Sequence, residues 1–216
     1  MKKGSICIIL GLILVVAALL LTGYNLMDNY RAGQAANKAL EQLVLRIEDD
    51  PIPIQGRITI EPSSPLTDVS DEIEYPDYIL NPGMDMPVEQ IDGKDYIGVI
   101  SIPAIGRELP VINEWNYTNL KTAPCRYAGS IYLNNMIICA HNYEIHFGSL
   151  KHLRYGDTVI FTDMDGNVFT YKVMEIETLQ PRAIEEMKNG EWDLTMFTCT
   201  IGGASRITVR CERTDL

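Results

Sequence analysis

Basic residues are scarce in this sequence. Its 216 residues include 18 lysines and arginines against 29 aspartates and glutamates, which gives a formal net charge of −11. Proteins that bind nucleic acid neutralise phosphates with a face rich in lysine and arginine, so the composition excludes nucleic acid as a partner. Nearly all of the excess charge lies in residues 48–90, where eleven acidic residues accompany a single base, Arg57. We therefore interpret the acidity as a property of a tether rather than of a binding surface.

Paired cysteines and metal-binding spacings are also lacking. The five cysteines are Cys7, Cys125, Cys139, Cys199 and Cys211. None belongs to a CxxC pair, and none shows a close zinc-type spacing with the three histidines. Disulfide frameworks are usual in small secreted domains with weak cores, whereas the 46% of apolar residues here are enough for a packed core. We therefore expect mostly free thiols, and neither a metal ion nor another cofactor.

Charge is absent from residues 6–21 (ICIILGLILVVAALLL), and the apolar character extends to Met27. An α-helix needs about 20 such residues to cross the hydrocarbon layer. Lys2 and Lys3 precede the stretch, and positive flanks tend to stay in the cytoplasm. The stretch is long for a cleaved signal peptide, and no clear cleavage site follows it. We predict a single-pass cell-membrane anchor that contacts lipid through residues 6–27, with a cytoplasmic N-terminus and an extracellular remainder.

Three segments are predicted along the chain. Residues 1–27 form the cytoplasmic tip and transmembrane anchor, residues 28–90 a stalk helix and an acidic, proline-rich linker, and residues 91–216 a folded domain. From residue 25 to 47, apolar side chains recur at spacings of three and four, which indicates a helix. This helix either continues from the membrane as a stalk, which we favour, or rests on the folded domain. Residues 48–90 contain seven of the eleven prolines, which is typical of an extended linker.

Short alternating runs replace the helical pattern after residue 94. About eight strands are expected on this criterion, with short helices at 116–121 and 147–153. The strands are predicted at residues 96–103, 108–113, 130–133, 135–141, 158–162, 168–178, 194–199 and 206–212. Many short strands with few short helices are typical of an all-β barrel or sandwich.

Two of the apolar strands end on residues that can carry chemistry. The run MIICAHN places His141 at a strand end, and LTMFTC ends on Cys199. If the strand that opens with Arg206 is its antiparallel neighbour, the guanidinium faces the thiol and can stabilise a thiolate or a developing oxyanion. His141 can then act as general acid and base. From the residues alone, a buried structural Cys199 is an equal alternative, and we expect His146 and His152 to be exposed surface residues.

The segments around these residues resemble one known family. TMFTC (residues 195–199) resembles the sortase signature TLxTC, with Met196 in place of the usual leucine, a nearly volume-conserving change. RITV (residues 206–209) resembles the strand that carries the essential arginine of sortases, and AHN (residues 140–142) resembles their histidine segment. The order of the three segments also agrees, and the similarity extends over about residues 94–213.

The resemblance implies a fold and an activity. The fold is an all-β, closed eight-stranded sortase-type barrel with short helices, preceded here by the N-terminal transmembrane helix. The activity is cleavage of an LPxTG-like C-terminal sorting signal on a secreted protein through a cysteine thioacyl intermediate. The acyl group then passes to an amine of a peptidoglycan precursor of the cell wall or of a pilin. By position, the resemblance makes Cys199 the nucleophile, His141 the general acid and base, Arg206 the oxyanion and substrate holder, and Thr198 a substrate-positioning residue.

Two assignments have rivals in the sequence. Arg210 shares a strand face with Arg206, because residues an even number apart point alike; we favour Arg206, which is nearer the strand end that holds Cys199. Cys139 shares a face with His141, so a zinc site that combines them with Cys199 is conceivable by ligand type. We favour a small buried side chain for Cys139.

The loop at residues 179–193 is too short for a long inserted helix, which resembles sortases of class A, C or D more than class B. Some sortases bind calcium near this loop, and Glu185 and Glu186 lie in it. Calcium takes six or more oxygen ligands, and little beyond Glu114 could add to this pair. We therefore interpret the two glutamates as a solvated helix face.

Two other functions compete with the transpeptidase. One is a catalytically silent, membrane-anchored β-barrel that serves as a binding or assembly module. The other is a plain cysteine protease, which would use water in place of the amine. The presence of all three chemical groups favours an enzyme over the silent module.

Overall fold

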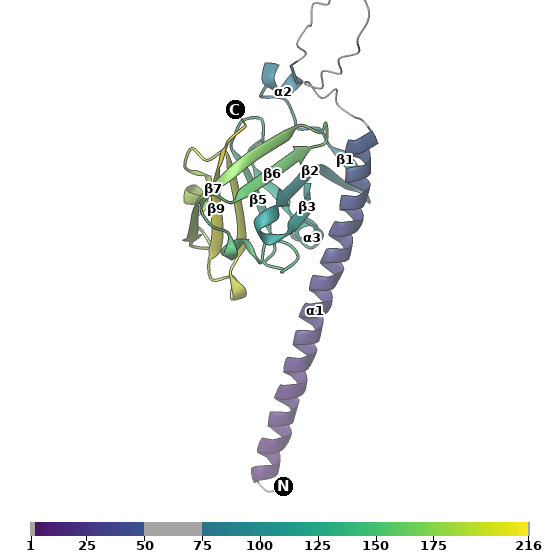
Figure 1. Cartoon of the computed structure of the whole chain (residues 1–216). Coiled ribbons are helices and arrows are strands. Elements are labelled where there is room, and N and C mark those ends of the chain that lie inside the picture. Colours follow the sequence, from purple (N-terminus) through teal and green to yellow (C-terminus); the bar gives the residue numbers. More distant parts are fainter. Residues whose placement is uncertain (1–2, 50–74, 216) are drawn as a thin grey trace, which may run out of the picture.

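The computed structural model describes residues 3–49 and 75–215, which form one long helix and a β-barrel (Figure 1). The helices are α1 (Lys3–Asp49), α2 (Asp77–Leu80), α3 (Tyr117–Leu120) and α4 (Ile184–Lys188), with 3-10 helices η1 (Pro103–Ile105), η2 (Leu150–His152) and η3 (Ile201–Gly203). The strands are β1 (Glu89–Ile91), β2 (Lys94–Ile102), β3 (Arg107–Ile112), β4 (Cys125–Ala128), β5 (Met136–Ala140), β6 (Thr158–Asp163), β7 (Val168–Leu179), β8 (Leu194–Cys199) and β9 (Arg206–Arg213). Residues 50–74 of the predicted linker lie outside the described residues.

Strands β2 to β9 close into a barrel. Neighbours follow the order β2-β3-β4-β5-β8-β9-β7-β6, and β6 pairs back onto β2 from Gly98–Asp163 to Ser101–Ile160. Strand β1 pairs with the first residues of β2 and is not one of the eight strands that close the barrel. The pairs β3–β4 and β5–β8 are parallel, whereas the other neighbours are antiparallel. The prediction of an all-β, closed eight-stranded barrel is therefore confirmed.

One predicted hairpin is shifted along the chain. The alternation placed its first arm at residues 130–133, but the strand that pairs with β5 is β4, and residues 131–134 form a turn. Ile131 and Tyr132 are nevertheless buried. Their burial explains the error, because an apolar turn that packs into a core gives the same local pattern as a strand.

The apolar residues form two clusters, one inside the barrel and one outside it. The interior cluster includes Ile100, Phe161, Phe169, Met196 and Val209, each of which is 0% exposed. The outer cluster lies between α1 and the wall of the barrel and includes Ala39, Leu43, Tyr96, Ile112 and Cys125. Both clusters follow from strand geometry, because successive side chains point to opposite faces of a sheet.

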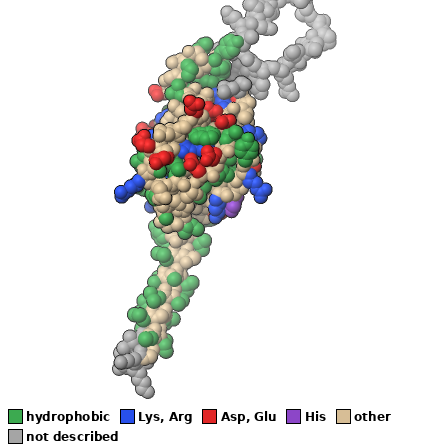
Figure 2. Space-filling model, turned by 90° about the vertical axis from the view of Figure 1, so that its left-hand side faces the viewer, with side chains coloured by type: hydrophobic (Ala, Val, Ile, Leu, Met, Phe, Trp, Pro, Cys, Tyr) green, Lys and Arg blue, Asp and Glu red, His purple; other side chains and the backbone are tan. Residues whose placement is uncertain are grey.

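Helix α1 runs without interruption for 47 residues, which corresponds to about 70 Å at 1.5 Å per residue. Residues 7–27 are exposed and project beyond the barrel (Figure 1). Apolar side chains lie along this projecting part, whereas charged side chains gather on the barrel (Figure 2). Within the described ranges, α1 is the one helix that is long and apolar enough to cross a membrane.

The second half of α1 docks on the barrel. Ala32, Ala36, Ala39 and Leu43 are at most 3% exposed and recur at spacings of three and four, so they form one face of the helix. Three of the four are alanines, whose small side chains allow the helix and the barrel wall to approach closely. Both arrangements considered for residues 25–47 are present together: the helix continues from the apolar stretch without a break, and its second half rests on the folded domain.

Gly98 lies at the point where β2 passes between β3 and β6. Its φ is +150°, and a β-carbon there would lie 2.2 Å from the carbonyl oxygen of Thr162. We expect Gly98→Ala to destabilise the barrel by about 3 kcal/mol or more, because both the backbone and the neighbouring strand must shift. Gly106→Ala is a matched control, since Gly106 has a φ of +59° but nothing within 4 Å of the added carbon.

For Gly106→Ala we expect a loss of about 1 kcal/mol, which is the cost of the left-handed backbone alone. Chemical denaturation of the full chain in detergent micelles gives both values. Equal losses in the two variants would contradict the close approach of β2 and β6.

Candidate active site

Two strand pairings bring the predicted site residues to one end of the barrel. In the antiparallel β8–β9 pair, Cys199 lies directly opposite Arg206. In the parallel β5–β8 pair, Ala140 is level with Thr198, so the chain leaves β5 with His141 beside Cys199. Neighbouring strands lie about 4.8 Å apart. Three adjacent strands therefore present the thiol, the imidazole and the guanidinium at one level.

The three side chains share the outer wall of the barrel. Met196 fills the interior, whereas Phe197 and Cys199 line a pocket on the outside. The pocket has a volume of about 440 Å³, which is within the range of ligand sites. His141 and Arg206 line the same pocket, together with apolar and aromatic side chains from α3, α4 and β4. The structure thus brings the three predicted groups together in one groove.

Cys199 is the partly exposed thiol of the barrel. Cys125, Cys139 and Cys211 are at most 4% exposed, and burial raises the pKa of each of these thiols. A thiol in apolar surroundings stays protonated and unreactive. Cys139 also lines the pocket but is 4% exposed, so Cys199 is the cysteine of the pocket with the more accessible sulfur.

The two arginines of β9 have different surroundings. Arg206 is partly exposed in the pocket, and its Nη1 donates to the carbonyl oxygens of Gly203 at 3.2 Å and Ser205 at 3.1 Å. These bonds hold the guanidinium at the base of the β8–β9 loop. A guanidinium has five N–H donors, so donors on the other nitrogens can serve a substrate.

Arg210 is 2% exposed and its donors are taken by the protein itself. Its Nε donates to a carboxylate oxygen of Glu177 at 2.8 Å, Nη1 to the carbonyl of Met187 at 2.9 Å, and Nη2 to the carbonyl of Glu186 at 2.7 Å. Arg210 therefore ties α4 to the barrel wall, and Arg206 is the arginine of the pocket.

Thr198 lies on β8 directly before Cys199, and it is level with Ala140 of β5. Its side chain is 3% exposed, and the hydroxyl donates to the carbonyl oxygen of Ala140 at 2.8 Å. The bond fixes the end of β8 against the end of β5, and so fixes Cys199 relative to His141. The role of Thr198 in positioning a substrate backbone stays a prediction.

His141 is half-buried, and its surroundings act on its pKa in opposite directions. Burial lowers the pKa of the imidazole, the carboxylate of Asp28 raises it, and the Lys121 ammonium lowers it, with a net lowering. The imidazole ring packs on the ring of Tyr143, with the two centroids 4.8 Å apart. Asp28 belongs to α1, so the long helix reaches the site.

The expectation for His146 was wrong. Its side chain is 0% exposed, whereas His152 is exposed as expected. Burial, together with the nearby His141, lowers the pKa of His146 to about 4. The loop after β5 folds back on itself, since the amides of His146 and Gly148 both donate to the carbonyl of Tyr143 at 2.9 Å. A polar-looking loop can therefore bury an imidazole.

The buried imidazole predicts a pH dependence of stability. Between pH 6.5 and 4 the unfolded chain binds a proton at residue 146 that the folded chain does not, so stability falls as the pH drops through this window. We expect this effect to cost about 2 kcal/mol between pH 7 and pH 5. His146→Gln removes the titrating group. Between pH 7 and pH 5, the unfolding free energy of this variant should therefore fall by about 2 kcal/mol less than that of the wild type. Parallel curves for the two proteins would contradict the assignment.

The side-chain geometry does not support the zinc site considered at Cys139 or a calcium site at Glu185 and Glu186. Cys139 belongs to the outer apolar cluster, and Glu185 and Glu186 are exposed on α4. Within residues 3–49 and 75–215, no three histidine, cysteine, aspartate or glutamate side chains are grouped so that they could hold a metal ion. The expectation of a reaction without a metal or other cofactor stays a prediction.

An aromatic wall in the pocket was missed by the sequence reasoning. Phe197 packs edge-on against Tyr127, with ring centroids 5.3 Å apart, and Tyr127 packs against Trp115 at 5.6 Å. Phe197 could have been found, because it lies two residues before Cys199 and so shares its strand face. Tyr127 belongs to β4, which the alternation pattern did not reveal, and Trp115 belongs to the loop before α3. Neither position has a local sequence pattern that predicts its place in the pocket.

Comparisons with known proteins point to one family. A family model described as a sortase domain matches residues 100–214. A curated relative, sortase A of Bacillus anthracis, is 24% identical over 205 residues, which cover 92% of this chain and 89% of that protein. The crystal structure of sortase C1 from Streptococcus agalactiae is 26% identical with a TM-score of 0.50, and the match covers 59% of this chain and 72% of that one. Sortase C1 of GBS Pilus Island 1 is 22% identical with a TM-score of 0.49, covering 56% of this chain and 65% of that one.

Proposed function

This chain belongs to the sortase family, and on that premise we propose that it cleaves an LPxTG-like C-terminal sorting signal through a thioacyl intermediate on Cys199. The acyl group then passes to an amine of a peptidoglycan precursor or of a pilin. The observation that carries the proposal is the register of β8 and β9, which sets Cys199 opposite Arg206 in a pocket that His141 also lines.

In the first half of the reaction, the thiolate of Cys199 attacks the carbonyl carbon of the scissile peptide bond. Arg206 donates hydrogen bonds to the oxygen as negative charge develops on it, which stabilises the tetrahedral intermediate. The C–N bond then breaks, and protonated His141 gives its proton to the leaving amine. The product is a thioester between Cys199 and the shortened protein.

In the second half, an incoming amine attacks the thioester carbonyl and neutral His141 takes the proton that the amine loses. Arg206 again stabilises the oxyanion, and the thiolate leaves as the new amide forms. The aromatic wall and the apolar side chains of α4 cover one side of the pocket. An apolar wall suits the leucine and proline of an LPxTG-like signal, and it limits the access of water to the thioester.

We also propose the membrane arrangement that suits such a substrate. The anchor over residues 6–27 spans the cell membrane with residues 1–5 in the cytoplasm, and the barrel of residues 91–216 lies outside the cell. The substrates are then secreted proteins that carry a C-terminal sorting signal. Both the substrates and the acceptor amine meet the enzyme at the outer face of the cell membrane.

Product analysis tests the proposal. The full chain in phospholipid nanodiscs is incubated with a panel of LPxTG-like peptides, with and without glycine oligomers and lysine-containing pilin peptides, and the products are separated by mass. We expect an amide product that requires the amine. Hydrolysis that does not change when an amine is added would instead indicate a cysteine protease, and no cleavage of any peptide would indicate the catalytically silent barrel.

A further inference from the structure

Helix α1 places a carboxylate beside the histidine of the site. Asp28 lies one residue after the apolar stretch that ends at Met27, and an oxygen of its carboxylate accepts a hydrogen bond from the hydroxyl of Tyr143. We propose that Asp28 is a positioning residue that, through Tyr143, holds the imidazole of His141 in its working orientation and so couples the active site to the membrane helix. The proposal rests on the proposed catalytic role of His141.

Tyr143 forms the centre of the loop that follows β5. Its ring packs between two imidazoles, with centroids 4.8 Å from His141 and 5.5 Å from His146. Its carbonyl accepts the amides of His146 and Gly148, and the amide of Phe147 returns to the carbonyl of His141 at 3.3 Å. Fixing the Tyr143 hydroxyl therefore fixes the ring against which the catalytic imidazole rests.

The Tyr143 hydroxyl remains protonated, and so can donate to Asp28, over a wide pH range. Burial and the neighbouring carboxylate both raise the pKa of the Tyr143 hydroxyl, so this group stays a donor over the physiological pH range. A hydrogen bond to an ionised acceptor is roughly twice as strong as a neutral one. The pair thus joins α1 to the histidine loop across 115 residues of sequence.

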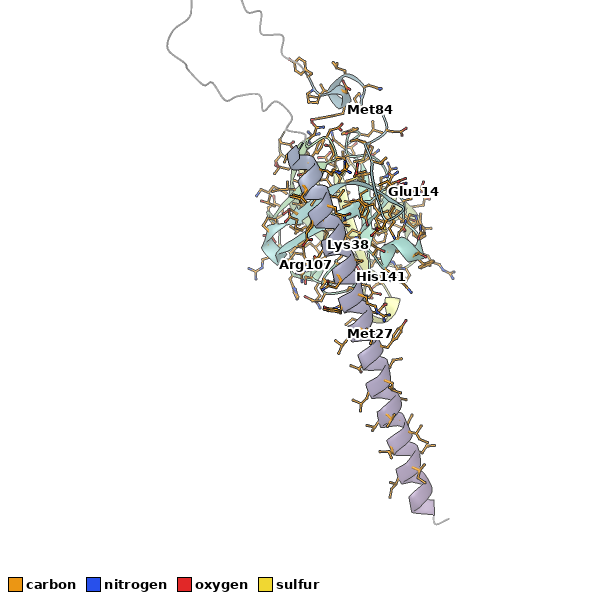
Figure 3. All side chains as sticks on the ribbon, turned by 90° about the vertical axis from the view of Figure 1, so that its right-hand side faces the viewer. Met27, Lys38, Met84, Arg107, Glu114 and His141 are labelled. Atoms are coloured by element: carbon orange, nitrogen blue, oxygen red, sulfur yellow. The ribbon has the colours of Figure 1, made fainter. Side chains whose placement is uncertain are left out.

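The docking of α1 fixes the position of Asp28. The buried face of Ala32, Ala36, Ala39 and Leu43 begins one helical turn beyond it. Gly33 lies against Ile145 so closely that a β-carbon there would come within 2.8 Å of the Ile145 side chain. Figure 3 shows Met27 and His141 at the same end of the barrel, with Lys38 farther along the helix. The carboxylate is therefore held by a rigid element.

Asp28 also acts on the charge of the imidazole. His141 must carry a proton when it meets the leaving amine, and burial opposes this, whereas the Asp28 carboxylate raises the pKa of His141. Titratable and charged groups face His141 from each neighbouring element. They are Asp28 of α1, Lys121 after α3, Tyr143 and His146 of its own loop, Cys199 of β8 and Arg206 of β9. Asp28 is the carboxylate among them.

The test uses the full chain in nanodiscs. For Asp28→Asn and Tyr143→Phe we expect kcat to fall about 10-fold with little change in KM for the peptide, because the imidazole loses its orientation but the pocket stays intact. In Asp28→Asn, the limb of the pH–rate profile that His141 governs should move to lower pH. The double variant should be no worse than the single ones, since the two residues act as one unit.

Asp92→Asn is the matched control. It breaks another contact between α1 and the barrel, the 2.7 Å pair of Lys38 and Asp92, without touching His141. We expect its kcat and pH profile to match those of the wild type, and thermal denaturation shows whether any variant has lost the fold. An effect of Asp92→Asn equal to that of Asp28→Asn would overturn the inference in favour of simple undocking of the helix.

Titration of His141 by NMR gives a readout that does not depend on turnover, with His141→Gln to assign the signal. We expect a lower pKa for His141 in Asp28→Asn than in the wild type. An unchanged pKa together with an unchanged kcat overturns the inference. The proposed function is tested separately, because it fails only if the wild type transfers no peptide or if Cys199→Ala stays active.

Discussion

Cys199→Ala is expected to abolish both cleavage and transfer, to below about one thousandth of the wild-type rate, because the thioester can no longer form. The barrel should remain folded. Cys199 is partly exposed at the end of β8, so removing its sulfur leaves no buried cavity. Steady-state kinetics of the full chain, with thermal denaturation alongside, measure both quantities.

Cys139→Ala is the matched control for this experiment. Cys139 is 4% exposed and lies two residues before His141, so its loss removes buried sulfur close to the site. We expect the variant to lose about 1 kcal/mol of stability through the small cavity, and to keep its activity within a few-fold. If Cys139→Ala were inactive and Cys199→Ala active, the nucleophile would be wrongly assigned.

The second large effect is expected at Arg206. Arg206→Ala should cost about 3 kcal/mol of transition-state stabilisation, or roughly a 150-fold fall in kcat/KM, because the developing oxyanion loses its donor. Stability should change little, since Arg206 is partly exposed and its hydrogen bonds go to carbonyls of its own loop, at Gly203 and Ser205. Arg206→Lys should recover part of the activity, because lysine keeps the charge but not the planar fork.

Arg210→Ala should give the opposite pattern. Its removal leaves the carboxylate of Glu177 and the carbonyls of Glu186 and Met187 without their buried partner. We expect a loss of about 3 kcal/mol in stability, with kcat/KM of the folded fraction within a few-fold of the wild type. A fall in activity without a fall in stability would make Arg210 the substrate-holding arginine.

Much of the barrel, and the grouping of Cys199, His141 and Arg206 in one pocket, could be predicted from the sequence. Two strands of the site begin or end on their functional residues, since Cys199 ends β8 and Arg206 begins β9, and His141 directly follows β5. In such strands, alternation fixes the face and the short connecting loop fixes the register. The same reasoning placed Arg206 nearer the thiol than Arg210, in agreement with their positions in the structure.

The remaining features depend on contacts between distant segments. Strand β4 is four residues long and contains an arginine, so its pattern was weaker than that of the buried turn beside it. His146 lies in a polar segment, and only the folded loop buries it. The approach of Asp28 to Tyr143 depends on how α1 docks, and a helical pattern gives the buried face of a helix without naming what covers it.

The central claim is that Cys199 carries the acyl group during the reaction. The most direct measurement is mass mapping of enzyme quenched by acid during turnover of a sorting-signal peptide without added amine. The tryptic peptide of residues 189–206 contains Cys199 as its single cysteine. We predict that this peptide gains the mass of the N-terminal peptide fragment as a thioester that hydroxylamine removes. Formation of product with no such adduct, or with the adduct on another residue, would contradict the account.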